Sequence, residues 1–163
     1  MSGVEPREFV PPPRDWTDGQ GRALGLWIAL ARCYSTYSKA VAAVVQERGL
    51  TLPQFGALEA LYHLGPLSLG ELADKLLVTG GNVTYVMDRL ESQGLVARFR
   101  SHDDRRVVRA ELTDRGRALV AEVFPEHAAY IEHLCRHLDA GEQDELRRLL
   151  KQLGKGIAGT DLP

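Results

Sequence analysis

Arginines are concentrated in one short stretch of the sequence. Residues 98–109 contain five arginines and only two aspartates, which gives this stretch a net charge of +3. Because the whole chain carries −2, the other 151 residues carry −5. Guanidinium groups at the tip of a β-hairpin suit the narrow, electronegative minor groove of DNA. The alternatives are a solvated charged face, or an Asp104–Arg106 pair that only holds a turn. The residues are Arg98, Arg100, Asp103, Asp104, Arg105, Arg106 and Arg109.

A second group of polar residues lies upstream, at the start of an expected helix. Gly80 and Gly81 at a helix N-terminus allow phosphate to approach the backbone N–H groups. Asn82 can bond the edge of adenine, and Thr84 can contact a base through its hydroxyl or methyl group. Alternatively the glycines form a loop and Asn82 caps the helix. The candidate DNA-contact residues are Ser68, Thr79, Gly80, Gly81, Asn82, Thr84, Tyr85, Arg89, Arg98, Arg100, Asp104, Arg105 and Arg106.

The elements that position these residues can be read from apolar spacing. A helix is expected over 68–76, a tight turn at 77–78 and a second helix over 79–93, closed by Gly94 in the left-handed conformation. Two strands, 95–100 and 107–112, follow with alternating residues. Two helices and a hairpin predict a winged helix-turn-helix, with a helical bundle and a stray hairpin as the alternative. The inward residues are Leu69, Leu72, Ala73, Leu76, Val83, Val86, Met87 and Leu90.

Helices flank this unit on both sides. A helix over 20–48, about 40 Å long, is longer than a compact domain needs and predicts packing against a second subunit. Capping signals begin helices at Thr51, Ser68 and Asp139. Helices over 114–137, with a kink or break at Pro125, and over 142–153 complete a dimerisation layer. The fold class is therefore mainly α with a small β-hairpin wing. We expect a flexible arm over 1–18, one domain over 19–153 with its winged unit at about 53–112, and a frayed tail over 154–163.

The segment from Leu67 to Gly116 resembles the MarR family of transcriptional regulators. Its D-x-R…L-T-x-x-G hallmark is present, and the resemblance extends over about residues 22–155. TGGNVTYVMDRLE and VFPEH are similar to the MhqR-like branch, which is associated with quinone and catechol stress. The resemblance implies a homodimer with a recognition helix in each major groove and the arginine at 106 in each minor groove. The hallmark residues are Asp104, Arg106, Leu112, Thr113 and Gly116.

The resemblance also implies a pocket between the first, second and fifth helices that accepts aromatic or phenolic ligands. Aromatic and histidine side chains occur on all three helices, although ordinary core packing explains such residues equally well. The candidate pocket residues are Trp27, Tyr34, Tyr62, His63, Phe124 and His127.

Two further groups could support sensing. Cys33 and Cys135 invite a redox switch, but neither has an adjacent His, Lys or helix N-terminus, so we expect inert, buried thiols. His133 and His137 have the i, i+4 spacing of a metal pair on one helix. Such spacing is common by chance, and we predict no metal site.

Several classes of protein are excluded. The sequence has no nucleophile elbow, phosphate loop or zinc-protease motif, and no enzyme activity or cofactor is expected. Two cysteines do not make a disulfide scaffold, and neither a transmembrane span nor a signal peptide is expected. We predict a cytoplasmic, sequence-specific, homodimeric repressor of a pseudo-palindromic DNA operator, released by a small aromatic or phenolic ligand or by oxidative stress. The alternative is a winged-helix module that binds an acidic protein and not DNA.

Overall fold

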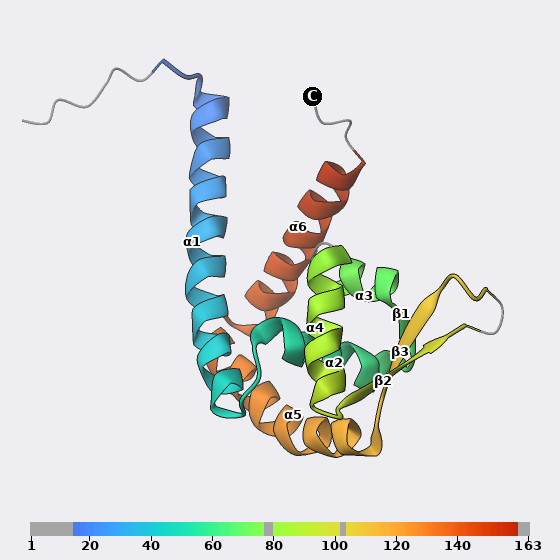
Figure 1. Ribbon diagram of the computed structural model, residues 1–163. Helices are drawn as coiled ribbons and strands as arrows, with labels where there is room; N and C mark the ends of the chain where they lie inside the picture. The colour runs from blue at the N-terminus through green and yellow to red at the C-terminus, as the bar shows by residue number, and fades with distance from the viewer. Residues whose placement is uncertain (1–14, 77–79, 102–103, 160–163) are drawn as a thin grey trace, which may run out of the picture. The chain divides into compact units, whose positions relative to one another are not determined.

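The computed structural model describes residues 15–76, 80–101 and 104–159. Its chain divides into two compact units, residues 1–37 and 38–163. Helix α1 (Asp18–Glu47) begins in the first unit and ends in the second. The predicted winged helix-turn-helix lies within the second unit and is confirmed (Figure 1).

The core of the second unit is built by three short helices. Helices α2 (Leu52–Leu64), α3 (Leu69–Leu76) and α4 (Gly80–Ser92) pack together through fully buried side chains. Each of the first two helices begins with a capping box, formed at Thr51 with Gln54 and at Ser68 with Glu71. Such reciprocal bonds satisfy backbone donors that a helix start leaves unpaired. The buried residues include Phe55, Leu58, Leu61, Leu72, Val83, Met87 and Leu90.

The sheet has one more strand than the sequence predicts. Strands β2 (Val96–Arg100) and β3 (Val108–Leu112) form the expected antiparallel hairpin, and β1 (Leu67–Ser68) pairs with the other edge of β3. A two-residue strand is too short to show alternation, so no sequence pattern marks it. In Figure 1 the hairpin projects away from the helices as a wing.

The C-terminal helices differ from their predicted bounds. Helix α5 (Asp114–Cys135) is continuous through Pro125, so of the two predicted outcomes, a kink or a break, the break is wrong. Helix α6 (Ala140–Ala158) begins at the predicted Asp139–Glu142 capping box but continues five residues beyond 153. The predicted fraying from Gly154 onward is therefore wrong for residues 154–158. Residues 160–163 lie outside the described part of the chain, as do residues 1–14 of the predicted arm.

Two helices carry apolar side chains that the single chain leaves exposed to water. On α1 the first unit exposes Leu24, Leu26, Trp27 and Ile28, and α6 has no buried residue although it carries a leucine-rich face. Within the described residues, no helix combines the length and the apolar character that a membrane span requires. The exposed residues of α6 are Leu146, Leu149, Leu150, Leu153 and Ile157.

Candidate nucleic-acid interface

Helix α4 divides cleanly into a buried face and an exposed polar face. Val83, Val86, Met87 and Leu90 are buried, as the three- and four-residue spacing predicts. The helix begins at Gly80, so the first backbone N–H groups of α4 have no partner within the helix. Thr79 lies outside the described residues. The exposed face carries Gly81, Asn82, Thr84, Tyr85 and Arg89.

Two of these exposed side chains contact each other. Tyr85 and Arg89 lie one helical turn apart, and the Arg89 Nε donates to the Tyr85 hydroxyl at 3.3 Å. The guanidinium carbon lies 5.5 Å from the centre of the tyrosine ring. This hydrogen bond raises the pKa of Arg89. The contact pre-orients the Tyr85 side chain, of which 61% is exposed, so that less rotamer entropy is lost when it meets a ligand.

Three wing arginines hold the hairpin itself. Arg100 Nη1 donates to the carbonyl of Arg105 at 2.8 Å, across the hairpin loop. Arg109 Nη2 donates to the carbonyl of Pro66 at 2.6 Å and so links β3 to the residue before β1. Arg98 pairs with two carboxylates of α4. These arginines stabilise the wing by contacts within the protein. A count of charges in the sequence does not distinguish such arginines from those that contact DNA.

The contact of Arg98 joins the wing to helix α4. Its Nε donates to Glu91 at 3.0 Å, and its Nη2 lies 2.7 Å from Asp88. The hydrogen bond from Arg98 lowers the pKa of Glu91, and the same bond raises the pKa of Arg98. Because both carboxylates neutralise it, the Arg98 guanidinium is not available as a free cation. Arg98 therefore joins the wing to α4, and its contact with DNA stays a prediction.

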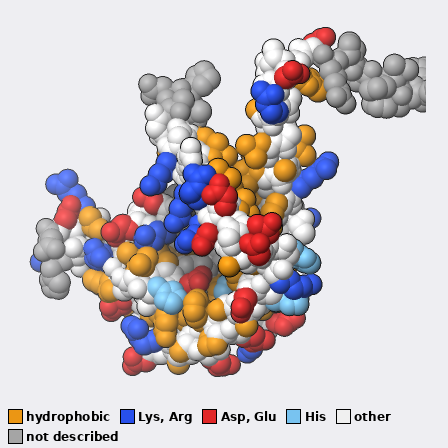
Figure 2. Space-filling model, turned by 180° about the vertical axis from the view of Figure 1, so that it is seen from behind, with side chains coloured by type: hydrophobic (Ala, Val, Ile, Leu, Met, Phe, Trp, Pro, Cys, Tyr) orange, Lys and Arg blue, Asp and Glu red, His pale blue; other side chains and the backbone are white. Residues whose placement is uncertain are grey.

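Two arginines at the tip of the wing differ from these three. Arg105 and Arg106 are exposed, and neither guanidinium has a hydrogen-bond or ion-pair partner within the described residues. Asp104 Oδ1 accepts the backbone N–H of Arg106 at 2.9 Å, so the aspartate holds the turn through the main chain. Figure 2 shows basic side chains at the end of the wing, next to an acidic one. Among the described residues, the wing therefore presents two unneutralised guanidinium groups at its tip, whereas His102 and Asp103 lie outside those residues.

The L-T-x-x-G part of the hallmark fastens the base of the wing. The Thr113 hydroxyl accepts the N–H of Gly116 and caps α5, while it donates to the carbonyl of Gly94 at 2.7 Å. The backbone N–H of Thr113 donates to the carbonyl of Leu95 at 3.1 Å. Two of these contacts tie the end of β3 to the turn that enters β2, and the third joins Thr113 to the start of α5. Gly94 has φ +68°, the left-handed conformation predicted for it.

Ser68 has a structural role at the start of α3. Its hydroxyl accepts the N–H of Glu71 at 3.2 Å, and its own N–H donates to the Glu71 carboxylate at 2.7 Å. The bond from the Ser68 backbone lowers the pKa of Glu71. Ser68 is half-buried at the start of α3. Its hydroxyl caps this helix because it accepts the N–H of Glu71.

Four of the six predicted ligand-pocket residues lie along the contact between α2 and α5. The ring of His63 lies edge-on to Phe124, with centroids 4.7 Å apart, and 5.2 Å from the ring of Tyr62. His127 packs against Phe55, which the sequence did not single out, at 4.7 Å. His127 is buried, and its Nδ1 has no hydrogen-bond partner among the described residues. The other two, Trp27 and Tyr34, are exposed on α1 in the first unit.

The candidate sensor residues differ from the sequence prediction in burial and in helix position. Cys33 is exposed and Cys135 is half-buried, so the prediction of two buried thiols is wrong, although both are free cysteines. Because α5 ends at Cys135, His137 lies beyond the helix and does not share its face with His133. The ring of His133 contacts the guanidinium of Arg136. Within the described ranges, no three His, Cys, Asp or Glu side chains lie close enough to hold a metal ion.

Comparison with known proteins identifies relatives over most of the chain. The sequence profile of the MarR family matches residues 50–108. The HTH-type transcriptional regulator MhqR of Bacillus subtilis is 36% identical over 133 residues, which cover 82% of this chain and 92% of MhqR.

Solved structures agree with this relationship. A mutant of MarR from E. coli in complex with operator DNA is 25% identical, with a TM-score of 0.74, and the match covers 84% of this chain and 99% of that one. BpsR of Bordetella bronchiseptica, described with the regulation of its DNA binding by 6-hydroxynicotinic acid, is 28% identical with a TM-score of 0.72. That match covers 80% of this chain and 98% of BpsR.

Proposed function

This chain belongs to the MarR family of transcriptional regulators, and from that premise we propose that it is a homodimeric repressor of a pseudo-palindromic operator. The protein is a DNA-binding regulator and not an enzyme. One observation carries the proposal: the exposed polar face of α4 and the wing belong to the same unit. At the tip of that wing, two guanidinium groups have no partner among the described residues.

Each part of this surface has a distinct role in the proposal. The exposed residues of α4 enter the major groove, where Asn82 and Tyr85 meet base edges or phosphates and the N-terminal N–H groups meet phosphate. The guanidinium of Arg106 enters the minor groove, and Asp104 sets the turn that aims it. Arg98 keeps the wing and α4 in fixed relation by its bonds to Glu91 and Asp88.

The exposed apolar faces support the homodimer. An isolated protomer leaves the leucines of α6 and the Leu24–Ile28 segment of α1 in water, and exposed apolar surface of this kind marks an interaction site. A two-fold dimer reads two half-sites about 34–36 Å apart, one turn of the DNA helix. We place this regulator in the cytoplasm, where its operator is.

Release by a small aromatic or phenolic ligand is the second part of the proposal. The rings of Tyr62, His63 and Phe124 lie together. The buried Nδ1 of His127 has no hydrogen-bond partner among the described residues, and a ligand hydroxyl can supply one. In the relative BpsR, DNA binding is regulated by 6-hydroxynicotinic acid, which is itself a hydroxylated aromatic acid. In one conformation of the dimer, the spacing of the two winged units does not match the spacing of the operator half-sites. A ligand that binds this conformation better releases the DNA.

Selection of bound DNA from a random pool tests this function. We expect enrichment of a two-fold symmetric sequence, and a mobility shift with the region upstream of the protein's own gene. Phenols and quinones added to the complex are expected to reduce the shift, whereas peroxide tests release by oxidation of Cys33 or Cys135. If no sequence is enriched at several salt concentrations, the DNA-binding proposal is wrong and a protein-interaction module is favoured.

A further inference from the structure

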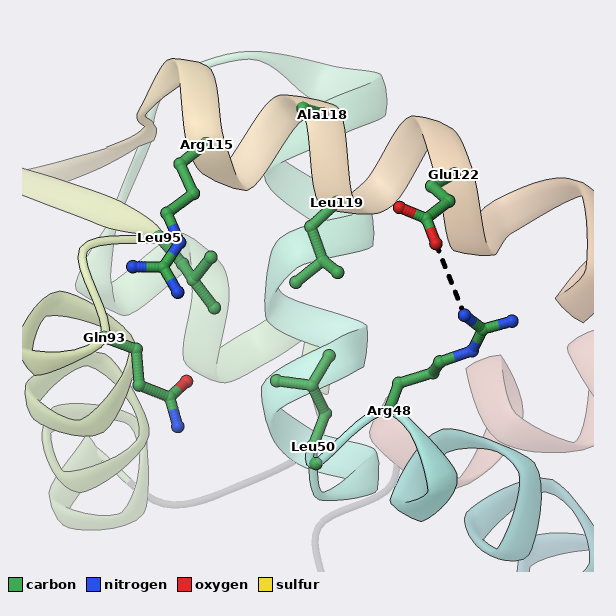
Figure 3. Close-up of a pocket in the computed structure, with 9 residues that line it drawn as sticks. Arg48, Leu50, Gln93, Leu95, Arg115, Ala118, Leu119 and Glu122 are labelled. Carbon is green, nitrogen blue, oxygen red and sulfur yellow. Dashed lines mark hydrogen bonds and ion pairs between the residues drawn. The ribbon is translucent and has the colours of Figure 1, made fainter.

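A groove of about 490 Å³ lies on the second unit. Three segments form it: the end of α1 with the turn that follows, the turn between α4 and β2, and the first half of α5 (Figure 3). Its volume is within the range of about 300–1,000 Å³ typical of small-molecule sites. The lining residues are Arg48, Gly49, Leu50, Gln93, Leu95, Arg115, Ala118, Leu119 and Glu122.

The groove combines an apolar floor with a polar rim. Leu50 and Leu95 are almost fully buried, and half-buried Leu119 points from α5 into the space between them (Figure 3). The side chains of Gln93 and Arg115 both line the groove and point toward one another in Figure 3. Small-molecule sites share this composition, in which apolar walls provide affinity and a few polar groups fix the orientation.

The charges of the rim favour an anion. At the far end, Arg48 is neutralised by Glu122 at 3.3 Å and by Glu126. Arg115 has no ion-pair partner within the described residues. Of the two arginines that line the groove, Arg115 is therefore the one whose charge no ion pair compensates among the described residues. A guanidinium binds a carboxylate through two parallel N–H donors.

We propose that this groove binds a small organic anion, with its carboxylate on Arg115 and Gln93 and its apolar body on Leu50, Leu95 and Leu119. The site differs from the pocket implied between α1, α2 and α5, because it shares none of the six residues named for that pocket. The proposal does not depend on DNA binding, because its test is binding to the free protein.

The test is calorimetric titration of the full chain with 2-naphthoate and with its neutral analogue 2-naphthamide. We expect 2-naphthamide to bind at least about tenfold more weakly, because it cannot pair with the guanidinium. Amide NMR spectra locate the site: 2-naphthoate is expected to shift the resonances of Gly49, Gly94 and Gly116. Absence of naphthoate binding, equal binding of both probes, or shifts confined to other regions would overturn the proposal.

Two variants and a control separate the site from general effects of charge. Arg115→Gln is expected to weaken 2-naphthoate binding about tenfold, and Ala118→Trp, at an exposed lining position, to block it by filling the groove. Arg117→Gln removes the same charge from an exposed position of α5 that does not line the groove, and is expected to bind like the wild type. Wild-type affinity in either lining variant, with folding verified by circular dichroism, contradicts the assignment.

Discussion

Helix α5 approaches the turn before the wing so closely that Gly116 has no space for a side chain facing Leu95. A Cβ atom on Gly116 would lie 2.0 Å from the carbonyl oxygen of Leu95. That carbonyl also accepts the N–H of Thr113, so it cannot move without loss of a hydrogen bond. The glycine of the hallmark is thus required by the close packing of α5 against the base of the wing.

Gly116→Ala is expected to lower the free energy of unfolding by about 2–4 kcal/mol, the range of severe overpacking against backbone. Urea denaturation monitored by circular dichroism measures the change. Gly154→Ala is the matched control, because nothing lies within 4 Å of the Cβ position on Gly154 in α6. There we expect a gain of about 0.5–1 kcal/mol from helix propensity. Equal stability of the two variants would contradict the steric argument.

Arg106→Ala is expected to weaken operator binding and to lower its salt dependence by about one unit per protomer, because an exposed guanidinium is lost from the wing tip. Fluorescence anisotropy with labelled operator at several salt concentrations provides the measurement. The dimer is expected to stay intact by analytical ultracentrifugation. Arg117→Ala removes an equal charge from α5 and is expected to leave the salt slope unchanged. An unchanged slope for Arg106→Ala would refute the wing assignment.

Glu91→Gln tests the connection between α4 and the wing through its pH dependence. Arg98 lowers the pKa of Glu91 in the folded state, whereas the unfolded chain titrates near the usual value of about 4.3. The stabilisation is therefore complete above the unfolded pKa and is lost as the pH falls through the folded pKa. Because the pair is partly exposed, we expect a loss below about 1 kcal/mol at pH 7.

Below the folded pKa of Glu91, the wild type and Glu91→Gln are expected to have the same stability, because the wild-type carboxyl is then protonated. Urea denaturation at neutral and at strongly acidic pH makes the comparison. Glu111→Gln, at an exposed position of β3, serves as the control and is expected to show no loss at pH 7. A loss for Glu91→Gln that is independent of pH would show that the ion pair does not cause it.

Leu150→Glu is expected to dissociate the proposed dimer, because it places a charge within the leucine face of α6. Sedimentation velocity measures the fraction of monomer. Gln152→Glu adds the same charge to the same helix outside this leucine face and is expected to remain dimeric. Dimers of unchanged affinity in Leu150→Glu would show that α6 is not part of the interface.

Local interactions account for what the sequence alone determined. The capping boxes at Thr51, Ser68 and Asp139 join residues three apart, so the helix starts can be read from short motifs. The buried and exposed faces of α4 follow from helical periodicity for the same reason. Apolar spacing also predicted the winged helix-turn-helix, and the resemblance to the MarR family added the function.

Contacts between distant residues were decided only by the tertiary structure. Arg48 meets Glu122 across 74 positions of the chain, and Arg109 meets the carbonyl of Pro66 across 43. The sequence shows five arginines in the wing region, and only the folded arrangement separates the three that stabilise the hairpin from Arg105 and Arg106. The same holds for the groove beside Arg115, because its walls come from three segments that folding alone brings together. Charge and spacing are local properties, whereas neutralisation of a charge depends on which side chains meet in space.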